Sequence, residues 1–293
     1  MAGFEGGVQG TVETAHHAAE HRVEGTANSL AVRVFSTGST GSTGSDGDAR
    51  PVLLIHGFAS STELNWVSTG WITALNDAGR TVIAVDLPGH GLSPAPEDLD
   101  AYTPSRIRAE LLQILQDHHV HPLAEGDPSS GVDVLGYSLG ARLAWEFAGT
   151  QPQLVHRVVM GGPASIDPLA TFDLEAAQAQ LSGGPAIGDP TTAELVRMAQ
   201  LVPTNNMFSL LSLVEAIKTE PFAPEEAVPS MPMLLVAGER DELAETLPTL
   251  MELASGHQGS DAHVRELILP ARTHANAVTS RAFKQAAVEF ING

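Results

Sequence analysis

The segment G-Y-S-L-G, residues 136–140, places a serine between two glycines at the junction of two patterns. An apolar run typical of a buried strand, 131–137, precedes Ser138, and a helical period, 139–150, follows it. Gly136 and Gly140 would let a strand and a helix approach closely on a tight turn. The start of a helix also offers free N–H groups and partial positive charge, which stabilise an oxyanion. The segment therefore predicts that Ser138 is a nucleophile that attacks a carbonyl carbon.

Further motifs follow apolar runs on both sides of this serine. They are H-G-F (56–58), D-L-P-G-H-G-L-S (86–93), G-E-R-D-E (238–242) and R-T-H (272–274). With these motifs, the chain from about residue 21 onward resembles the α/β-hydrolase superfamily, in which G-x-S-x-G forms the nucleophile elbow. The resemblance implies an α/β-hydrolase fold, with a mostly parallel, eight-stranded-type sheet flanked by helices.

The resemblance also implies an oxyanion hole. Its two donors map to the backbone N–H groups of Phe58, after H-G, and of Leu139, after the nucleophile. Two such donors converge on the negative charge that develops during attack on a carbonyl. His56 lies inside the H-G turn, where the family pattern favours a structural hydrogen-bonding role, and His90 in P-G-H-G is interpreted as a turn residue.

A serine nucleophile needs a base, and twelve histidines compete for that role. In the family the chain order is serine, then acid, then histidine. His257 lies in a Gly/Ser-rich loop and His263 lies just ahead of a strand. His274 follows the last predicted strand and precedes the last predicted helix. We therefore predict that His274 is the general base.

The acid that orients this histidine has three candidates, each shortly after a predicted strand. Asp241 occupies the family's usual place after the penultimate strand. Asp167 follows the strand before a long insertion, a site that some members of the superfamily use instead. Glu239 is the third candidate. We favour Asp241, and Asp167 stays open as the main alternative.

Short apolar runs alternate with helical periods from residue 51 onward, which predicts a parallel sheet with helical crossovers. The predicted strands are 29–35, 51–57, 81–86, 131–137, 156–162, 233–238 and 264–269, and the predicted helices are 69–78, 104–118, 139–150, 242–255 and 275–291.

One interval, 164–230, contains helical patches at 173–181, 191–201 and 206–219 and no strand-like run. We interpret it as a helical cap over the strand ends, inserted into a core of residues 21–163 and 231–293. Residues 1–20 are expected to be a solvated N-terminal segment, and the Ser-Thr-Gly repeat after residue 35 a surface loop. Six apolar cap residues could contact substrate or form the cap's own core: Leu195, Met198, Leu201, Met207, Phe208 and Leu211.

Composition narrows the function classes. The formal net charge of −20 would repel phosphate backbones and anionic lipid surfaces, so neither nucleic acid nor membrane is expected as a partner. The absence of cysteine excludes disulfides, a thiolate nucleophile and Cys-based metal sites. The first ten residues lack the pattern of a secretory signal, and a cytoplasmic protein is expected. The mechanism predicted here requires no cofactor and no metal.

The expected function is therefore a serine hydrolase that cleaves a small, hydrophobic carboxylic ester through an acyl-enzyme. The same triad would serve a lactonase or a carbon–carbon bond hydrolase, and a non-catalytic ligand-binding protein on this scaffold is a further alternative. Haloalkane dehalogenases and soluble epoxide hydrolases resemble this family but carry an aspartate at the elbow. Ser138 excludes their chemistry.

Overall fold

Short, fully buried runs form the centre of one sheet. The computed structural model describes residues 19–23, 30–37, 49–258 and 264–293, so the expected terminal segment up to residue 18 and most of the Ser-Thr-Gly repeat lie outside the described residues. The eight strands of the sheet are β1 (Ala19–Val23), β2 (Ala31–Ser36), β3 (Val52–Ile55), β4 (Val82–Asp86), β5 (Val132–Tyr137), β6 (Val155–Gly161), β7 (Met233–Gly238) and β8 (Val264–Leu269).

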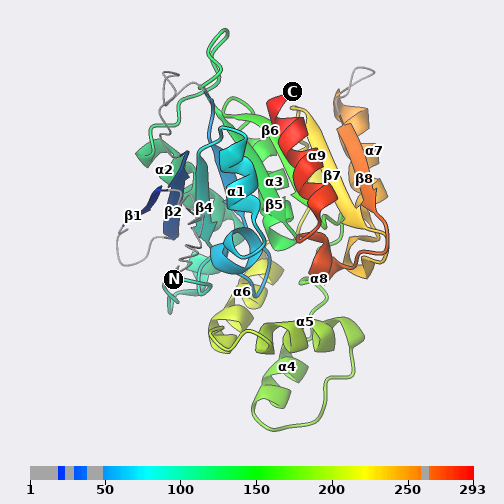
Figure 1. Ribbon diagram of the computed structural model, residues 1–293. Coiled ribbons are helices and arrows are strands. Elements are labelled where there is room, and N and C mark those ends of the chain that lie inside the picture. The colour runs from blue at the N-terminus through cyan, green and yellow to red at the C-terminus, as the bar shows by residue number, and fades with distance from the viewer. Residues whose placement is uncertain (1–18, 24–29, 38–48, 259–263) are drawn as a thin grey trace, which may run out of the picture.

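The strands follow the order β1-β2-β4-β3-β5-β6-β7-β8 (Figure 1). The pairs β1/β2 and β2/β4 are antiparallel, and every other neighbouring pair is parallel. The mostly parallel α/β sheet expected from the sequence is confirmed. Strand β1 was not predicted, and the expected boundary at residue 20 falls inside it.

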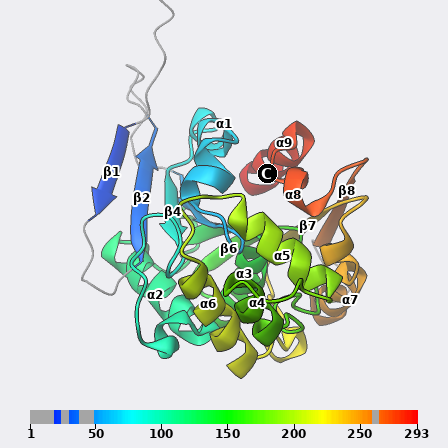
Figure 2. The same cartoon turned by 90° about the horizontal axis from the view of Figure 1, so that it is seen from below.

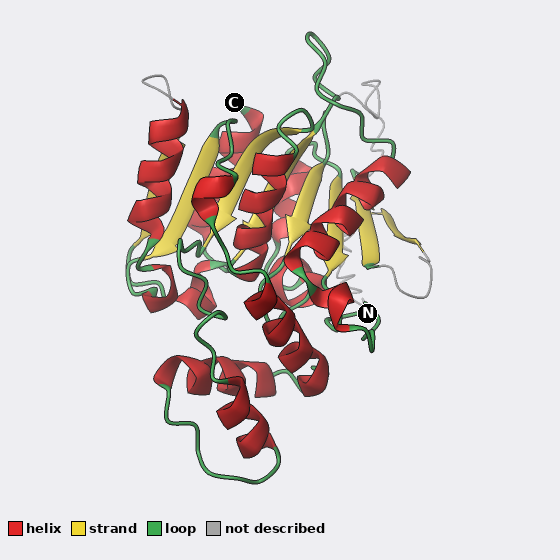
Figure 3. Cartoon of the chain, turned by 180° about the vertical axis from the view of Figure 1, so that it is seen from behind, coloured by secondary structure: helices red, strands yellow, loops and turns green. Residues whose placement is uncertain are grey.

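Alternate residues along each strand point to opposite faces, and helices cover both. Leu53 and Ile55 of β3 belong to the core beneath the helices at 104–117, 139–150 and 247–258, whereas Val52 and Leu54 belong to the core beneath the helices at 71–77 and 281–292. Figures 1 and 3 show these two helical layers from opposite sides. The helices of the core are α1 (Trp71–Asp77), α2 (Pro104–Asp117), α3 (Leu139–Thr150), α7 (Leu247–Gln258), α8 (His274–Ala277) and α9 (Arg281–Asn292).

Two predicted helices are each divided in the structure. The range 242–255 begins with a 3-10 turn, Glu242–Ala244, and α7 starts only at Leu247, because Pro248 fits the first turn of a helix but not its interior. The range 275–291 contains α8 and α9 separately. Ser280 caps the second of these, since its side chain accepts a hydrogen bond from the N–H of Phe283.

The segment between β6 and β7 folds into α4 (Leu174–Leu181), α5 (Pro190–Gln200) and α6 (Met207–Thr219). Each begins at a side chain that accepts a hydrogen bond from the first turn: Asp173, Asp189 and Asn206, respectively. Viewed from below, these helices lie across the carboxyl ends of the parallel strands (Figure 2). Among the described residues, no helix is long and apolar enough to cross a lipid bilayer.

Candidate active site

Ser138 lies on the turn between β5 and α3 in a strained conformation, with φ 55° and ψ −116°. The flanking glycines explain how the turn fits. A Cβ atom at Gly136 would lie 2.1 Å from the carbonyl oxygen of Gly140, and one at Gly140 would lie 2.0 Å from that of Ile55. Any side chain at either position would separate the strand from the helix. The turn therefore presents Ser138 at the carboxyl end of the central strand.

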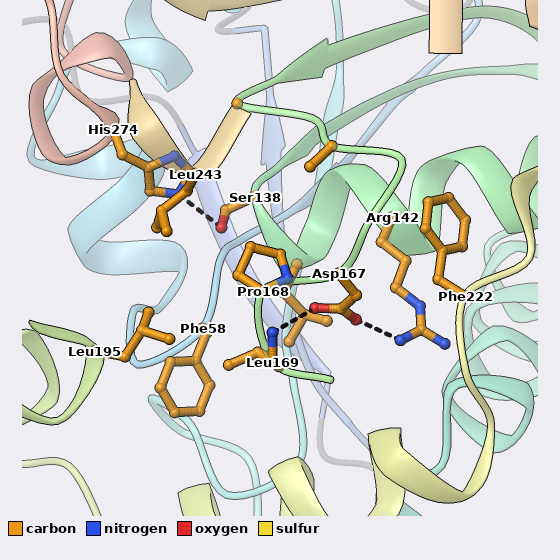
Figure 4. Close-up of a pocket in the computed structure, with 13 residues that line it drawn as sticks. Phe58, Ser138, Arg142, Asp167, Pro168, Leu169, Leu195, Phe222, Leu243 and His274 are labelled. Carbon is orange, nitrogen blue, oxygen red and sulfur yellow. Dashed lines mark hydrogen bonds and ion pairs between the residues drawn. The ribbon is translucent and has the colours of Figure 1, made fainter. Parts of the chain in front are cut away.

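The structure brings Ser138, His274 and Asp241 together. Nε2 of His274 lies 2.8 Å from Oγ of Ser138. Nδ1 lies 2.9 Å from Oδ1 and 3.0 Å from Oδ2 of Asp241. When Nδ1 carries the ring proton, it donates a hydrogen bond to the carboxylate, and Nε2 accepts one from the serine hydroxyl. This is the tautomer that a general base needs. Figure 4 shows His274 directed at Ser138. Asp241 and His274 lie just beyond β7 and β8, so the topology of the sheet assembles the three side chains.

Two residues that the sequence did not single out help to place the imidazole. Gly162, at φ +60°, follows β6, and a Cβ atom there would lie 2.8 Å from Cε1 of His274. The hydroxyl of Tyr137 donates a hydrogen bond to the backbone carbonyl of His274. Burial and the charge of Asp241 raise the pKa of Tyr137, so the phenol stays a neutral donor. The sequence G-G at the end of the predicted strand 156–162 could have pointed to a close contact at Gly162. No sequence pattern indicates the contact of Tyr137, because it joins residues 137 positions apart.

The other two candidate acids are engaged elsewhere. Glu239 accepts the backbone N–H of Ala271 at 2.7 Å. Asp167 forms a buried ion pair with Arg142 and accepts the N–H of Leu169 at 2.8 Å (Figure 4). Of the three, Asp241 is the one whose carboxylate contacts the His274 ring.

The two expected oxyanion donors lie beside Ser138. Phe58 and Leu139 both line the cavity that contains Ser138 and His274. Leu139 is the first residue of α3, where a backbone N–H has no acceptor within the helix. Within the described part of the chain, neither N–H donates to a protein acceptor. Both remain available to a ligand.

Three side chains hold the loop 57–59, which carries the Phe58 N–H. The N–H of Gly57 donates to Oδ1 of Asn65 at 2.9 Å. The N–H of Ala59 donates to Nε2 of His90 at 3.1 Å. Nδ2 of Asn205, in the linker between α5 and α6, donates to the carbonyl oxygen of Ala59 at 3.0 Å. Ala59 also has a positive φ of 56°. The donor position is thus fixed by the core and by the linker between two cap helices.

His56 and His90 have structural roles, as their motifs indicated. Nδ1 of His56 contacts the carbonyl of Gly57 at 2.8 Å, and its Nε2 accepts the N–H of Leu87 at 3.0 Å. Burial lowers the pKa of His90 to about 3, with a further contribution from His56. Burial also lowers the pKa of His56, against the charge of Asp86. Both imidazoles are therefore neutral at physiological pH.

Two cavities meet at Ser138. The smaller, about 30 Å³, extends towards Arg142, Asp167 and Phe222. The larger, about 270 Å³, is lined chiefly by apolar side chains, among them Met198 and Leu201 of the cap. No group of three or more His, Asp or Glu side chains among the residues described could hold a metal ion. The Ser138 hydroxyl thus lies between a narrow compartment, which includes Arg142 and Asp167, and a wider, mainly apolar one.

The six apolar residues that could contact substrate fall into two groups of three in the structure. Leu195 lines both cavities, and Met198 and Leu201 line the larger one. Met207, Phe208 and Leu211 instead line a separate hollow between α4 and α6. Phe208 is 86% exposed. Of the two roles left open for these last three residues, the structure gives no support to substrate contact beside Ser138, because they line the hollow between α4 and α6 and neither cavity at Ser138.

Comparison with known proteins gives the same fold. Residues 50–182 match the family model described as the alpha/beta hydrolase fold. Epoxide hydrolase 3 of Xenopus tropicalis is 34% identical over 137 residues, 45% of this chain and 33% of that protein. AB hydrolase superfamily protein YfhM of Bacillus subtilis is 29% identical over 115 residues, 38% of this chain and 35% of that protein. The matched segments thus span about a third of these curated relatives.

Whole-chain similarity appears among solved structures. A carboxylesterase structure from Nitrososphaera gargenis superposes with a TM-score of 0.66 at 14% identity, covering 93% of this chain and 98% of that one. At that identity the likeness concerns the fold. Together with the family match over residues 50–182 and the sheet order, it shows that the chain has the α/β-hydrolase fold.

Proposed function

We propose that the protein is a serine hydrolase that cleaves small, hydrophobic carboxylic esters through an acyl-enzyme. The hydrogen-bonded series Asp241–His274–Ser138 on the nucleophile elbow carries this proposal. A serine hydroxyl is weakly nucleophilic unless a base removes its proton during attack. The distance of 2.8 Å between Nε2 of His274 and Oγ of Ser138 supports this role for His274.

The reaction proceeds in two stages. Oγ of Ser138 attacks the ester carbonyl while Nε2 of His274 takes its proton, and the N–H groups of Phe58 and Leu139 stabilise the oxyanion. The tetrahedral intermediate collapses, and the alcohol leaves with the proton held by His274. Water, deprotonated by His274, then attacks the acyl-enzyme and releases the acid and free Ser138. Asp241 stabilises the imidazolium in both stages.

The nature of the nucleophile favours acyl chemistry over epoxide opening, although several curated relatives are named epoxide hydrolases. A carboxylate that opens an epoxide forms an ester, which water cleaves at its carbonyl. Ser138 would form an ether, which has no carbonyl for water to attack. Turnover through Ser138 therefore requires an acyl group.

The larger cavity supports the substrate class. Leu195, Met198, Leu201 and Val278 contribute aliphatic surface next to Ser138. Each buried methylene of a substrate chain contributes about 0.8 kcal/mol when it leaves water. A short acyl or alkoxy chain fits a cavity of about 270 Å³.

Hydrolysis of a panel of short p-nitrophenyl esters, simple lactones and a vinylogous 1,5-diketone tests this proposal. We expect the highest kcat/KM for the esters and loss of all turnover in Ser138→Ala. Ser60→Ala, which removes another hydroxyl from the larger cavity, is the matched control and should retain activity. Preference for lactones or for carbon–carbon cleavage would reassign the substrate on the same triad. Turnover that persists in Ser138→Ala would contradict the proposal.

A further inference from the structure

The side-chain amide of Asn65 has a defined orientation. Its Oδ1 accepts the backbone N–H of Gly57 at 2.9 Å, and an N–H group can only donate. The amide oxygen therefore faces the oxyanion loop, and Nδ2 faces away from it. Asn65 is 8% exposed, so this orientation is set inside the protein and not by solvent.

Nδ2 of Asn65 has two N–H groups and, among the described residues, no acceptor. Asn65 lines the larger cavity together with Ser138 and Phe58. Nδ2 is not among the fully buried polar atoms that lack a partner, so it is open to the cavity, where water or a ligand oxygen can accept its hydrogen bonds. The orientation and the position of Asn65 together point this donor at the substrate compartment.

The surroundings of the amide make such a donor selective. The cavity around it is lined mainly by aliphatic side chains, including Leu64, Val202 and Val278. The hydroxyl of Tyr137, which also lines the cavity, already donates to the carbonyl of His274. Apart from Ser138 and His274, the side-chain donors that line this cavity include the Asn65 amide and the Ser60 hydroxyl, and of these two the amide has its orientation fixed by the Gly57 contact. An apolar wall with so few polar groups discriminates strongly between ligands with and without a matching acceptor.

We propose that Nδ2 of Asn65 donates a hydrogen bond to an oxygen of the substrate in the larger cavity. Preferred substrates then carry an ether, keto or hydroxyl oxygen a few atoms from the scissile carbonyl, in addition to an apolar chain. This inference rests on the proposed ester hydrolysis and adds a polar group to its substrate class.

Matched substrates that exchange one methylene for an ether oxygen test the proposal. On the acyl side they are p-nitrophenyl butyrate and p-nitrophenyl methoxyacetate, and on the alcohol side butyl butyrate and 2-methoxyethyl butyrate. For each pair, the ratio of kcat/KM for the ether to that for the alkyl ester is measured in wild type and variants. Because each pair differs in intrinsic reactivity, only the change of this ratio with the variant is interpreted.

Two variants separate the donor from the loop contact. Asn65→Asp keeps an oxygen that accepts the Gly57 N–H but replaces Nδ2 with a second oxygen, whereas Asn65→Leu removes both groups. For the pair whose variable chain occupies the larger cavity, we expect the ratio to fall about five- to tenfold in both variants, the usual effect of one hydrogen bond. Should Asn65→Leu fail to fold, Asn65→Asp alone decides.

An unchanged ratio in both pairs would overturn the inference, even if overall activity falls, because Asn65 would then only hold the loop. The proposed function is tested separately by the alkyl esters. If wild type hydrolyses butyrate esters through Ser138 but the ratios do not move, only the role of Asn65 is lost. If wild type hydrolyses none of the four esters, the proposed function itself fails.

Discussion

Each ring nitrogen of His274 faces a different side chain: Nδ1 lies 2.9 Å from Oδ1 and 3.0 Å from Oδ2 of Asp241, and Nε2 lies 2.8 Å from Oγ of Ser138. Asp241→Asn leaves the size of the side chain unchanged but removes the carboxylate that fixes the tautomer. We expect kcat to fall by about 10⁴-fold, as in other triads of this kind, with a small change in KM. Steady-state kinetics on p-nitrophenyl butyrate provide the measurement.

Asp167→Asn is the matched control, because Asp167 pairs with Arg142 instead of His274. Breaking this buried pair should cost about 3 kcal/mol or more of stability, seen as a lower Tm, while kcat of the folded fraction stays within a few fold. A larger loss of kcat in Asp167→Asn than in Asp241→Asn would move the acid to the strand before the cap.

The residues of the triad could be predicted because each follows a recognisable strand, and the order of the strands then brings the three together. The residues that hold the triad and the oxyanion loop in position could not be predicted from the sequence. Asn205 contacts Ala59 across 146 positions of the chain, and Tyr137 contacts the carbonyl of His274 across 137. Such contacts depend on how elements pack, which no local pattern records.

At the scale of elements, the linker between α5 and α6 is tied to the oxyanion loop through Asn205. Asn205→Leu should lower kcat by about tenfold, with little change in KM. The loss is smaller than the hundredfold or larger effect of losing an oxyanion donor, because the variant would displace the Phe58 N–H without removing it. Inhibition by a trifluoromethyl ketone, whose adduct with Ser138 carries an oxyanion, should weaken in parallel. An unchanged inhibition constant would mean that the linker does not position the donor.

Helix α5 supplies the cap's wall of the larger cavity. Met198→Ala enlarges that cavity, and we expect kcat/KM for hexanoate relative to butyrate to rise about fourfold for each methylene accommodated. Phe208→Ala is the control, since this exposed side chain of α6 lines the separate hollow. A change in chain-length preference in Phe208→Ala but not in Met198→Ala would contradict the assigned walls.

The three helices between β6 and β7 follow the helical patches predicted from periodicity. Periodicity does not reveal which apolar side chains of a short helix face substrate and which face a neighbouring helix. Leu195 and Met207 are both large and apolar, and only the packing of α4, α5 and α6 separates their surroundings. The division of the range 242–255, by contrast, could have been read from Pro248.

At the scale of the whole molecule, the strands β3, β4, β5 and β7 were predictable because they are fully buried and therefore mostly apolar. Strand β1 has the sequence A-E-H-R-V and lies at the edge of the sheet, next to β2. Edge strands are short and often charged, which conceals them in a sequence. The pairing of β1 with β2 is what identifies it.

Buried neutral histidines make the stability of the whole fold depend on pH. The pKa of His90 is lowered to about 3 by burial, and that of His56 is also lowered. Between the ordinary histidine pKa of about 6.5 and the folded value, the unfolded chain binds more protons, so stability is lost as pH falls. Each histidine contributes up to about 1.4 kcal/mol per pH unit in this window.

The free energy of unfolding at pH 7, 6 and 5, measured by urea denaturation, tests this dependence. His90→Gln, which retains an acceptor for the Ala59 N–H and does not titrate, should be less stable than wild type at pH 7. The deficit should shrink as pH falls towards 5. A deficit that is constant with pH would show that His90 is not held neutral by the fold.

The central claim is that Ser138 is the nucleophile, and covalent labelling by a fluorophosphonate tests it most directly. Intact-mass spectrometry of the wild-type protein should show one adduct per chain, and peptide mapping should place it on Ser138, because His274 activates this hydroxyl at 2.8 Å. Ser138→Ala should show no adduct under the same conditions. Stoichiometric labelling of Ser138→Ala, or an adduct on another residue of the wild type, would contradict the account.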